Sequence, residues 1–155
     1  MNRGIRFAAV LALLCVLGAA VPLAAQPTAE GQATLYKRLG GYDAIAAVVD
    51  DFIGRLATDP QLSRFFVGHS TQSLQRIRQL VVEQICAAAG GPCFYTGRSM
   101  KESHAGMGIT QAEWEVALKH LTATLDKFKV GAKEREDLFA AIAPLQADIV
   151  DSKKK

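Results

Sequence analysis

Residues 95–110 read YTGRSMKESHAGMGIT and contain one of only three histidines in a chain of 155 residues. Ser99 and Glu102 stand three residues apart, the spacing of a capping box, in which a hydroxyl and a carboxylate satisfy each other's unpaired backbone N–H groups. The pattern predicts that a helix begins here. Two glycines follow His104 almost at once and should stop the helix from growing. Because so short a helix is not stable alone, we expect something else to hold it.

Segments with apolar residues at helical spacing lie on both sides of this motif. Thr110 and Glu113 repeat the capping-box pattern and predict the start of a second helix. The expected helices cover residues 34–39, 42–57, 70–89, 110–128 and 132–150, with short turns at 59–66 and 99–104. No run of alternating strand residues competes with them. The sequence therefore predicts an all-α domain of four substantial helices and three short segments.

The first 25 residues differ in kind from the rest and predict a secretory signal peptide. Arg3 and Arg6 precede the apolar run 7–20, and small residues before Gln26 form a fair cleavage site. The alternative is an uncleaved membrane anchor, because residues 7–25 carry no charge. Cleavage is the favoured interpretation, so we expect a periplasmic or secreted protein, in contact with a membrane only if residues 7–25 remain.

Charge and composition beyond the signal peptide are those of an ordinary globular domain. Loss of Arg3 and Arg6 with the peptide lowers the formal charge from +3 to +1. We expect a flexible leader at 26–33, one domain at 34–150 and a basic tail at 151–155. No basic stripe with interleaved aromatic residues is present, so we expect no nucleic-acid binding.

Two cysteines, Cys86 and Cys93, lie in the expected domain. An exported chain meets an oxidising compartment, where a disulfide is permitted, and the Gly-Gly-Pro between them allows the chain to fold back. Unpaired cysteine is also a common buried residue, and the sequence alone leaves both alternatives open. The absence of nearby further ligands argues against a zinc site.

His104 has three alternative roles on these observations: a residue at a helix end, a catalytic base or a haem ligand. Histidine near a helix C-terminus interacts well with the last carbonyls and the helix dipole. A Gly-x-Ser-x-Gly motif is absent, which disfavours a catalytic triad. Zinc would need further close ligands, whereas His69 and His120 lie far along the chain. A haem iron needs only one protein ligand and an apolar slot lined by aromatic residues.

The order of motifs resembles the group I truncated haemoglobins. The matching stretches are LYKRLGG at 35–41, FF at 65–66 and GGPCFYTGRSMKESHAGMGIT at 90–110, followed by a helix with an early aromatic residue. The resemblance covers residues 34–150. It implies a two-over-two helical sandwich around haem b, with His104 as the proximal ligand of the iron.

The resemblance also implies which residues contact the haem. The apolar and aromatic positions that match are Phe65, Phe66, Tyr95, Met100, Ile109 and Trp114. Arg98 and Lys101 are candidates to pair with the haem propionates. Simple core packing is the alternative for the apolar residues, and ordinary solvation is the alternative for the two basic residues.

The distal side is where this sequence departs from its relatives. Many group I members carry tyrosine where this chain has Ile53, and a polar residue on the helix after Phe66. The corresponding distal positions here are Ile77 and Val81, with Leu80 beside them. Gln79 or Gln84 would supply a hydrogen-bond donor if that helix were rotated. His69 is a candidate sixth ligand, but a solvated loop histidine is the favoured interpretation. An apolar pocket predicts weak oxygen binding, because each missing donor forfeits roughly 1–3 kcal/mol.

The resemblance implies reversible binding of O2, NO or CO, for oxygen transport or NO scavenging. One alternative is a haem enzyme, an NO dioxygenase or peroxidase, that needs a redox partner. The apolar pocket disfavours this alternative, because peroxide cleavage benefits from a distal acid–base group. A further alternative is a secreted helical interaction module without a cofactor.

Overall fold

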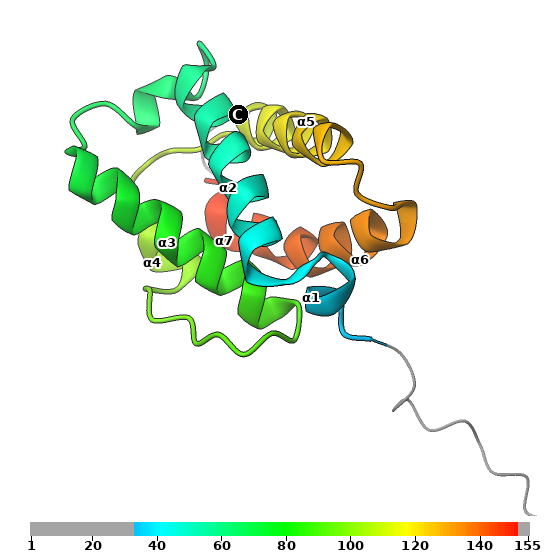
Figure 1. The fold of residues 1–155 in the computed structure, drawn as a ribbon. Helices are drawn as coiled ribbons and strands as arrows, with labels where there is room; N and C mark the ends of the chain where they lie inside the picture. The colour runs from blue at the N-terminus through cyan, green and yellow to red at the C-terminus, as the bar shows by residue number, and fades with distance from the viewer. Residues whose placement is uncertain (1–32, 152–155) are drawn as a thin grey trace, which may run out of the picture. The chain divides into compact units, whose positions relative to one another are not determined.

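The structure is a computed structural model that describes residues 33–151 (Figure 1). The expected signal peptide, nearly all of the leader and all but the first residue of the basic tail lie outside the described residues. The helices are α1 Leu35–Arg38, α2 Gly41–Thr58, α3 Thr71–Ala88, α4 Met100–His104, α5 Gln111–Lys127, α6 Ala132–Ile142 and α7 Gln146–Ile149, with 3₁₀ turns at Ser63–Phe65 and Ala143–Leu145. Residues 33–151 contain no strand, which confirms the all-α fold class.

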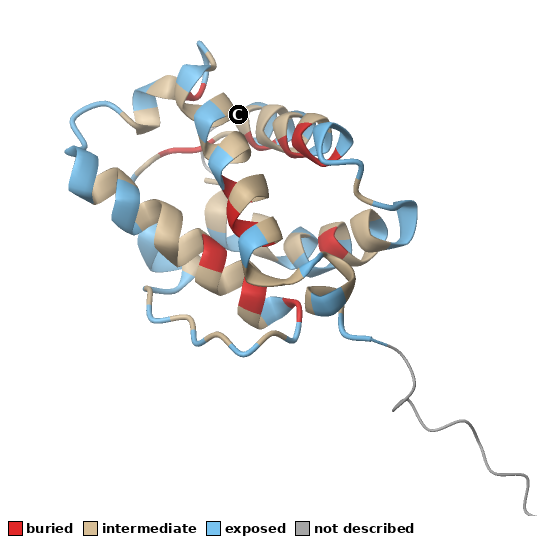
Figure 2. Cartoon of the chain, in the orientation of Figure 1, coloured by how far each residue is buried: buried red, intermediate tan, exposed pale blue. Residues whose placement is uncertain are grey.

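Helix α2 packs against both α3 and α5 (Figure 1), and α5 meets α6 through the side chains of a core cluster. One core cluster lies between α2 and α3, and a second lies between α5 and α6 (Figure 2). The buried residues of the first are Ile45, Ala46, Val49, Val82 and Cys86, and those of the second are Leu121, Leu125 and Leu138. Val48 and Phe52 of α2 reach the second cluster, so α2 joins the two clusters.

Both capping boxes are present, which confirms the two helix starts. The Glu102 backbone N–H donates to Ser99 Oγ, and the Ser99 backbone N–H donates to the Glu102 carboxylate at 3.0 Å. Thr110 and Glu113 make the same reciprocal pair at the start of α5. Each box satisfies backbone donors that the first turn of a helix leaves unpaired.

The prediction of one last helix over 132–150 is wrong. The structure divides this segment into α6, the 3₁₀ turn at 143–145 and α7. Pro144 lies inside that turn. Proline has no backbone N–H to donate and its ring clashes with the carbonyl four residues earlier, so an uninterrupted α-helix is not stable through this position.

None of the helices in the described part of the chain is long and apolar enough to cross a membrane.

Asp51 links α2 to α5 through a nearly buried carboxylate. Its Oδ2 accepts from Thr124 Oγ1 at 2.8 Å and from Arg55 Nε at 2.6 Å, and Lys127 Nζ donates to Oδ1. Thr124 is completely buried, so Asp51 is the partner that satisfies its hydroxyl. The bond from Arg55, followed by those from Lys127 and Thr124, holds the pKa of Asp51 well below its usual range.

We expect this carboxylate to make stability dependent on pH. A carboxyl whose pKa is lower in the folded state contributes stability above its unfolded pKa, and loses it as the pH falls through the folded pKa. The free energy of unfolding should therefore fall below about pH 5. Urea unfolding from pH 7 to pH 3 measures this. In Asp51→Asn the free energy of unfolding should fall less between pH 5 and pH 3. Glu136→Gln, at an exposed carboxylate, is the control; an equal fall in both variants would contradict the prediction.

Candidate functional site

His104 is the last residue of α4, and the geometry of this helix orients its ring. The Nδ1–H of His104 donates to the backbone carbonyl of Met100 at 2.8 Å. A carbonyl only accepts, so in the neutral imidazole the proton lies on Nδ1 and the lone pair lies on Nε2. A fixed tautomer of this kind is how proteins prepare an imidazole to coordinate a metal. The side chain is half-buried.

The carboxyl end of the chain holds α4 in place. Helix α7 packs against α4 (Figure 1). The Asp151 backbone N–H donates to the Ile109 carbonyl at 2.8 Å, which ties the residues after α7 to the segment after α4. The 3₁₀ turn at Pro144 separates α6 from α7. The expectation that something else must hold a five-residue helix is thus met by tertiary packing.

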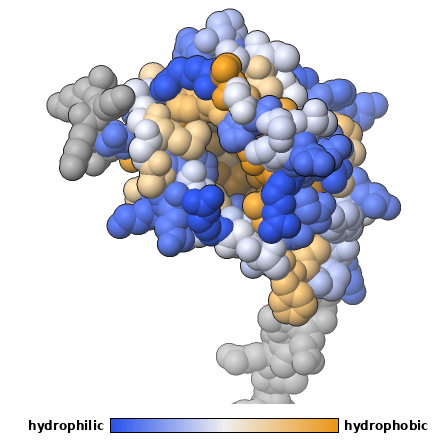
Figure 3. Space-filling view, turned by 90° about the vertical axis from the view of Figure 1, so that its left-hand side faces the viewer, coloured by the Kyte–Doolittle hydropathy of each residue, from blue (hydrophilic) through white to orange (hydrophobic). Residues whose placement is uncertain are grey.

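The face that carries α3 and α4 is hollowed. Figure 3 shows a depression with a hydrophobic floor and a largely hydrophilic rim on this side of the molecule. An apolar depression with a hydrophilic rim is the kind of site that binds a flat, largely apolar cofactor with polar edges.

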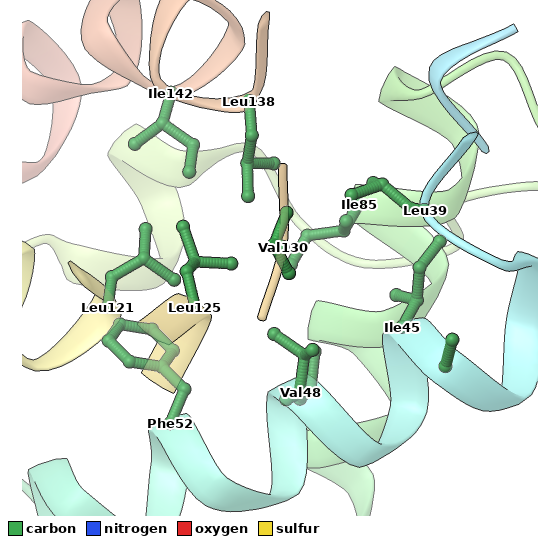
Figure 4. Close-up of a pocket in the computed structure, with 12 residues that line it drawn as sticks. Leu39, Ile45, Val48, Phe52, Ile85, Leu121, Leu125, Val130, Leu138 and Ile142 are labelled. Atoms are coloured by element: carbon green, nitrogen blue, oxygen red, sulfur yellow. The ribbon is translucent and has the colours of Figure 1, made fainter. Parts of the chain in front are cut away.

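A cavity of about 50 Å³ lies between α2, α5 and α6 (Figure 4). Val48 and Phe52 of α2 point into it, opposite Leu121 and Leu125 of α5. None of the predicted haem-contact residues lines it. This cavity is therefore not the candidate site.

The predicted aromatic and apolar contacts come from two segments that an ion pair joins. Phe65 and Phe66 are half-buried at the end of the 3₁₀ turn, whereas Ile109 and Trp114 are buried near the start of α5. The Arg64 guanidinium lies 4.0 Å from the centre of the Phe65 ring. It also pairs with Glu113 at 2.8 Å. The structure thus brings the Phe65 turn close to the beginning of α5.

The predicted residues around α4 have different surroundings. Tyr95 is half-buried, and its hydroxyl donates to the Arg98 carbonyl at 2.6 Å, which fixes the turn before α4. Met100 is half-buried, while Arg98 and Lys101 are exposed. The bond from the Ser99 hydroxyl lowers the pKa of Glu102. The sequence analysis did not predict this role of Tyr95. Gly97, two residues later, is a signal for it, because a side chain at position 97 would collide with the Tyr95 ring.

The predicted distal residues lie on α2 and α3. Ile53 and Val81 both pack against the core cluster between these helices, and Ile77 and Leu80 are half-buried on α3. The amide of Gln79 is bonded to the Tyr42 hydroxyl at 3.0 Å and to the Glu83 carboxylate at 3.0 Å.

The other two histidines have polar partners away from α4. His69 is exposed, and its Nδ1 lies 2.9 Å from Ser73 Oγ. His120 Nε2 donates to the Asp59 carboxylate at 2.8 Å, and this bond lowers the pKa of Asp59. Within residues 33–151, no group of three or more His, Cys, Asp or Glu side chains is placed to hold a metal ion. A haem iron does not need such a group.

Cys86 and Cys93 are bonded, with their Cα atoms 5.8 Å apart. The sequence left this pairing open. The bond joins the end of α3 to the connection that leads to α4.

We expect Ser99→Ala to loosen α4 without unfolding the domain. The substitution removes the hydroxyl that accepts from the Glu102 N–H, and loss of such a cap lowers helix stability by about 0.5–2 kcal/mol. Hydrogen exchange of the amides at 100–104 should therefore become faster. Glu102→Gln keeps a side chain suited to a capping box and should retain most of the protection. Equal exchange in Ser99→Ala and the parent protein would contradict the role of the box.

Comparison with known proteins gives one consistent result. The family model described as "Bacterial-like globin" matches residues 34–151. A group 1 truncated haemoglobin from Mycolicibacterium paratuberculosis is 38% identical over 117 residues, which is 76% of this chain and 84% of the relative. One from Nostoc sp. is 30% identical over 118 residues, 76% of this chain and 98% of the relative.

Solved structures show the same fold. The truncated haemoglobin from Tetrahymena pyriformis in the Fe(III) form superposes with a TM-score of 0.71 at 24% identity, over 77% of this chain and all of that one. The 2/2 haemoglobin from Synechococcus sp. PCC 7002, in the cyanomet state and with covalently attached haem, gives a TM-score of 0.69 at 25% identity, over 76% and 98% of the two chains.

Proposed function

This chain belongs to the bacterial-like globin family, among the group 1 truncated haemoglobins, and from this premise we propose that it holds haem b through His104 and binds diatomic gases reversibly. The observation that carries the proposal is the His104 ring, whose Nδ1–H donates to the Met100 carbonyl and whose Nε2 keeps its lone pair. When bound, haem supplies an iron that takes O2, NO or CO. Family membership disfavours the alternative of a module without a cofactor.

The residues present fit this group. The depression in Figure 3 has a hydrophobic floor, and we propose that Phe65, Phe66, Tyr95, Met100, Ile109 and Trp114 contact the haem. Arg98 and Lys101 are exposed beside and within α4, and we propose that they pair with the propionates. Such contacts bind and orient the cofactor and exclude water from its apolar faces.

Two observations support haem b, the form without a covalent link, over an attached haem. Cys86 and Cys93 are bonded to each other, so neither thiol is available for a thioether link. The two histidines other than His104 have other partners, since His69 bonds to Ser73 and His120 bonds to Asp59, so neither is placed for a covalent link to haem. The Synechococcus relative carries covalently attached haem, so the type of attachment needs its own measurement.

We propose that the distal pocket is apolar, lined by Ile53, Ile77, Leu80 and Val81. The alternative donor Gln79 already bonds to Tyr42 and Glu83, which supports this proposal. Without a donor in the pocket, an oxygen ligand loses charge-assisted hydrogen bonding, whereas carbon monoxide depends on it less. The pocket should therefore favour CO and NO over O2.

We also propose that the protein is exported. Basic residues followed by an uncharged apolar run at the N-terminus support this location. A disulfide in the domain is a second support, because such bonds persist in oxidising compartments. N-terminal sequencing of the protein recovered from the periplasm or medium would test both export and cleavage before Gln26.

Absorption spectra of the exported protein in ferric, ferrous and CO-bound forms test the central proposal. We expect a Soret band in each form, together with complete transfer of the haem into acidified butanone if the cofactor is haem b. Absence of a Soret band after haem is supplied would overturn haem binding. Haem that stays with the protein during extraction would overturn only the noncovalent type.

A further inference from the structure

The disulfide Cys86–Cys93 joins a completely buried cysteine to one that is only half-buried. Cys86 lies in the last turn of α3 and is completely buried, whereas Cys93 is half-buried in the connection between α3 and α4. Exchange requires a thiolate to reach a sulfur of the bond. Cys93 packs against the core cluster between α2 and α3 but is the less buried of the two residues, so its sulfur is the one that an attacking thiolate reaches more readily.

An apolar contact lies directly beside this sulfur. Phe94 is 86% exposed, and Pro92 on the other side of Cys93 is also exposed. Aromatic rings supply much of the contact energy at protein interfaces, so a ring as exposed as that of Phe94 is suited to contact with a partner. Its position next to an exchangeable disulfide indicates a partner that acts on the disulfide.

The bond is also a main tie between this connection and α3. Figure 1 shows the connection as a long loop that leads from α3 to α4. From residues 91–96, the Gly91 N–H donates to the Cys86 carbonyl at 2.8 Å, and the Thr96 hydroxyl donates to the Glu83 carboxylate at 3.3 Å. The disulfide adds a covalent tie to these hydrogen bonds. Three residues beyond Thr96, Ser99 caps the helix that carries His104.

We propose that Cys86–Cys93 is a thiol–disulfide exchange site for a dithiol protein that docks on Phe94, and that reduction of the bond loosens the connection leading to His104. The exchange is independent of haem, and only its effect on haem retention rests on the function proposed above.

The exchange proceeds in two displacements. A thiolate of the partner attacks Cys93 Sγ, a bond forms between these sulfurs, the bond to Cys86 breaks, and Cys86 leaves as a thiolate that takes up a proton. The partner's second thiol then loses its proton, attacks the partner sulfur of the mixed disulfide, and releases Cys93, which is protonated in turn. The partner dithiol is oxidised to a disulfide, and this chain receives two electrons and two protons.

Reduction should change the connection more than the core. A neutral cysteine behaves as a small apolar side chain, so Cys86 keeps its packing in the cluster between α2 and α3. The loop loses its covalent tie, and the hydrogen bonds to the Cys86 carbonyl and Glu83 remain. Greater freedom at 91–99 passes directly to the start of α4.

Rates of reduction test the docking step. Reduced thioredoxin serves as the protein dithiol and dithiothreitol as the small one, with thiol alkylation followed by mass spectrometry. Phe94→Ser should slow reduction by thioredoxin about tenfold and leave reduction by dithiothreitol unchanged. Val67→Ser, at another exposed apolar residue, is the matched control and should change neither rate. Equal thioredoxin rates for Phe94→Ser and the parent protein would overturn docking on Phe94.

Hydrogen exchange of the full chain tests the loosening step. Amides at 91–104 should exchange about tenfold faster in the reduced protein, while those at 45–53 in α2 stay protected. The double variant Cys86→Ser/Cys93→Ser should reproduce the reduced pattern. No change at 91–104, or an equal rise in α2, would overturn a local effect of the disulfide.

Haem transfer to excess apomyoglobin tests the link to the haem site. The holoprotein with a reduced disulfide should lose haem faster than the holoprotein with an intact disulfide, with the iron ferric in both. Equal rates would overturn this link. If the chain bound no haem at all, the proposed function would fail, while the rates of reduction and the hydrogen exchange would still decide the exchange site.

Discussion

Replacing His104 with alanine is expected to abolish the Soret band of the ferrous and ferric protein at stoichiometric haem. The imidazole is the one proposed protein ligand of the iron, and its Nδ1–H bond to the Met100 carbonyl leaves Nε2 to coordinate. Loss of a residue that merely supports a ligand typically lowers metal affinity 10–100-fold. Loss of the ligand itself should therefore lower haem affinity by more than about 100-fold. Titration with haem followed at the Soret band measures this.

His69→Ala is the matched control for this experiment, because His69 is exposed and bonded to Ser73. It should leave the spectrum unchanged. His104→Gly with imidazole added in solution should recover a Soret band, because the small molecule occupies the place of the missing ring. Circular dichroism of both His104 variants shows whether the helices remain. An unchanged Soret band in His104→Ala would contradict the assignment of the ligand.

The start and end of α4 could be predicted from the sequence because their causes are local. Ser99 and Glu102 satisfy each other within one turn, and the glycines at 106 and 108 adopt positive φ angles of 78° and 61° just past the helix. Contacts between residues three or four apart depend only on helical geometry. The same reasoning correctly gave the start of α5 at Thr110.

The surroundings of α4 could not be predicted in this way, because they depend on distant parts of the chain. Nothing in residues 95–110 indicates that α7 packs on α4 or that the Asp151 N–H bonds to the Ile109 carbonyl. Pro144 did carry a signal, since it cannot continue a helix, but apolar spacing on both sides favoured one long helix. Tertiary contacts decide such cases.

The sequence also left open whether the two cysteines bond and which groups the Gln79 side chain contacts, because both depend on tertiary structure. Whether Cys86 and Cys93 bond depends on a Cα distance of 5.8 Å that the turn between them sets. Whether Gln79 can serve a distal pocket depends on the rotation of α3, and the structure turns its amide toward Tyr42 and Glu83. The apolar distal side itself stays a prediction.

Ile53→Tyr is expected to slow oxygen dissociation by one to two orders of magnitude. The tyrosine hydroxyl would donate to an oxygen ligand in the proposed pocket, and a charge-assisted bond of this kind contributes roughly 1–3 kcal/mol. Each 1.4 kcal/mol corresponds to about a tenfold change. Dissociation of carbon monoxide should change much less. Stopped-flow exchange of oxygen against carbon monoxide measures both rates.

Ile53→Phe is the matched control, because it adds the same ring without the hydroxyl. Ile53 is half-buried and packs against the cluster between α2 and α3, so either ring strains the packing by about 1–3 kcal/mol. That shared effect cancels when the two variants are compared. A slower oxygen rate in the tyrosine variant alone would locate position 53 within reach of the ligand and identify the missing donor as the cause of weak binding. Equal rates in both variants would instead show that residue 53 does not reach the ligand. The isoleucine at this position would then be no evidence that the pocket lacks a donor.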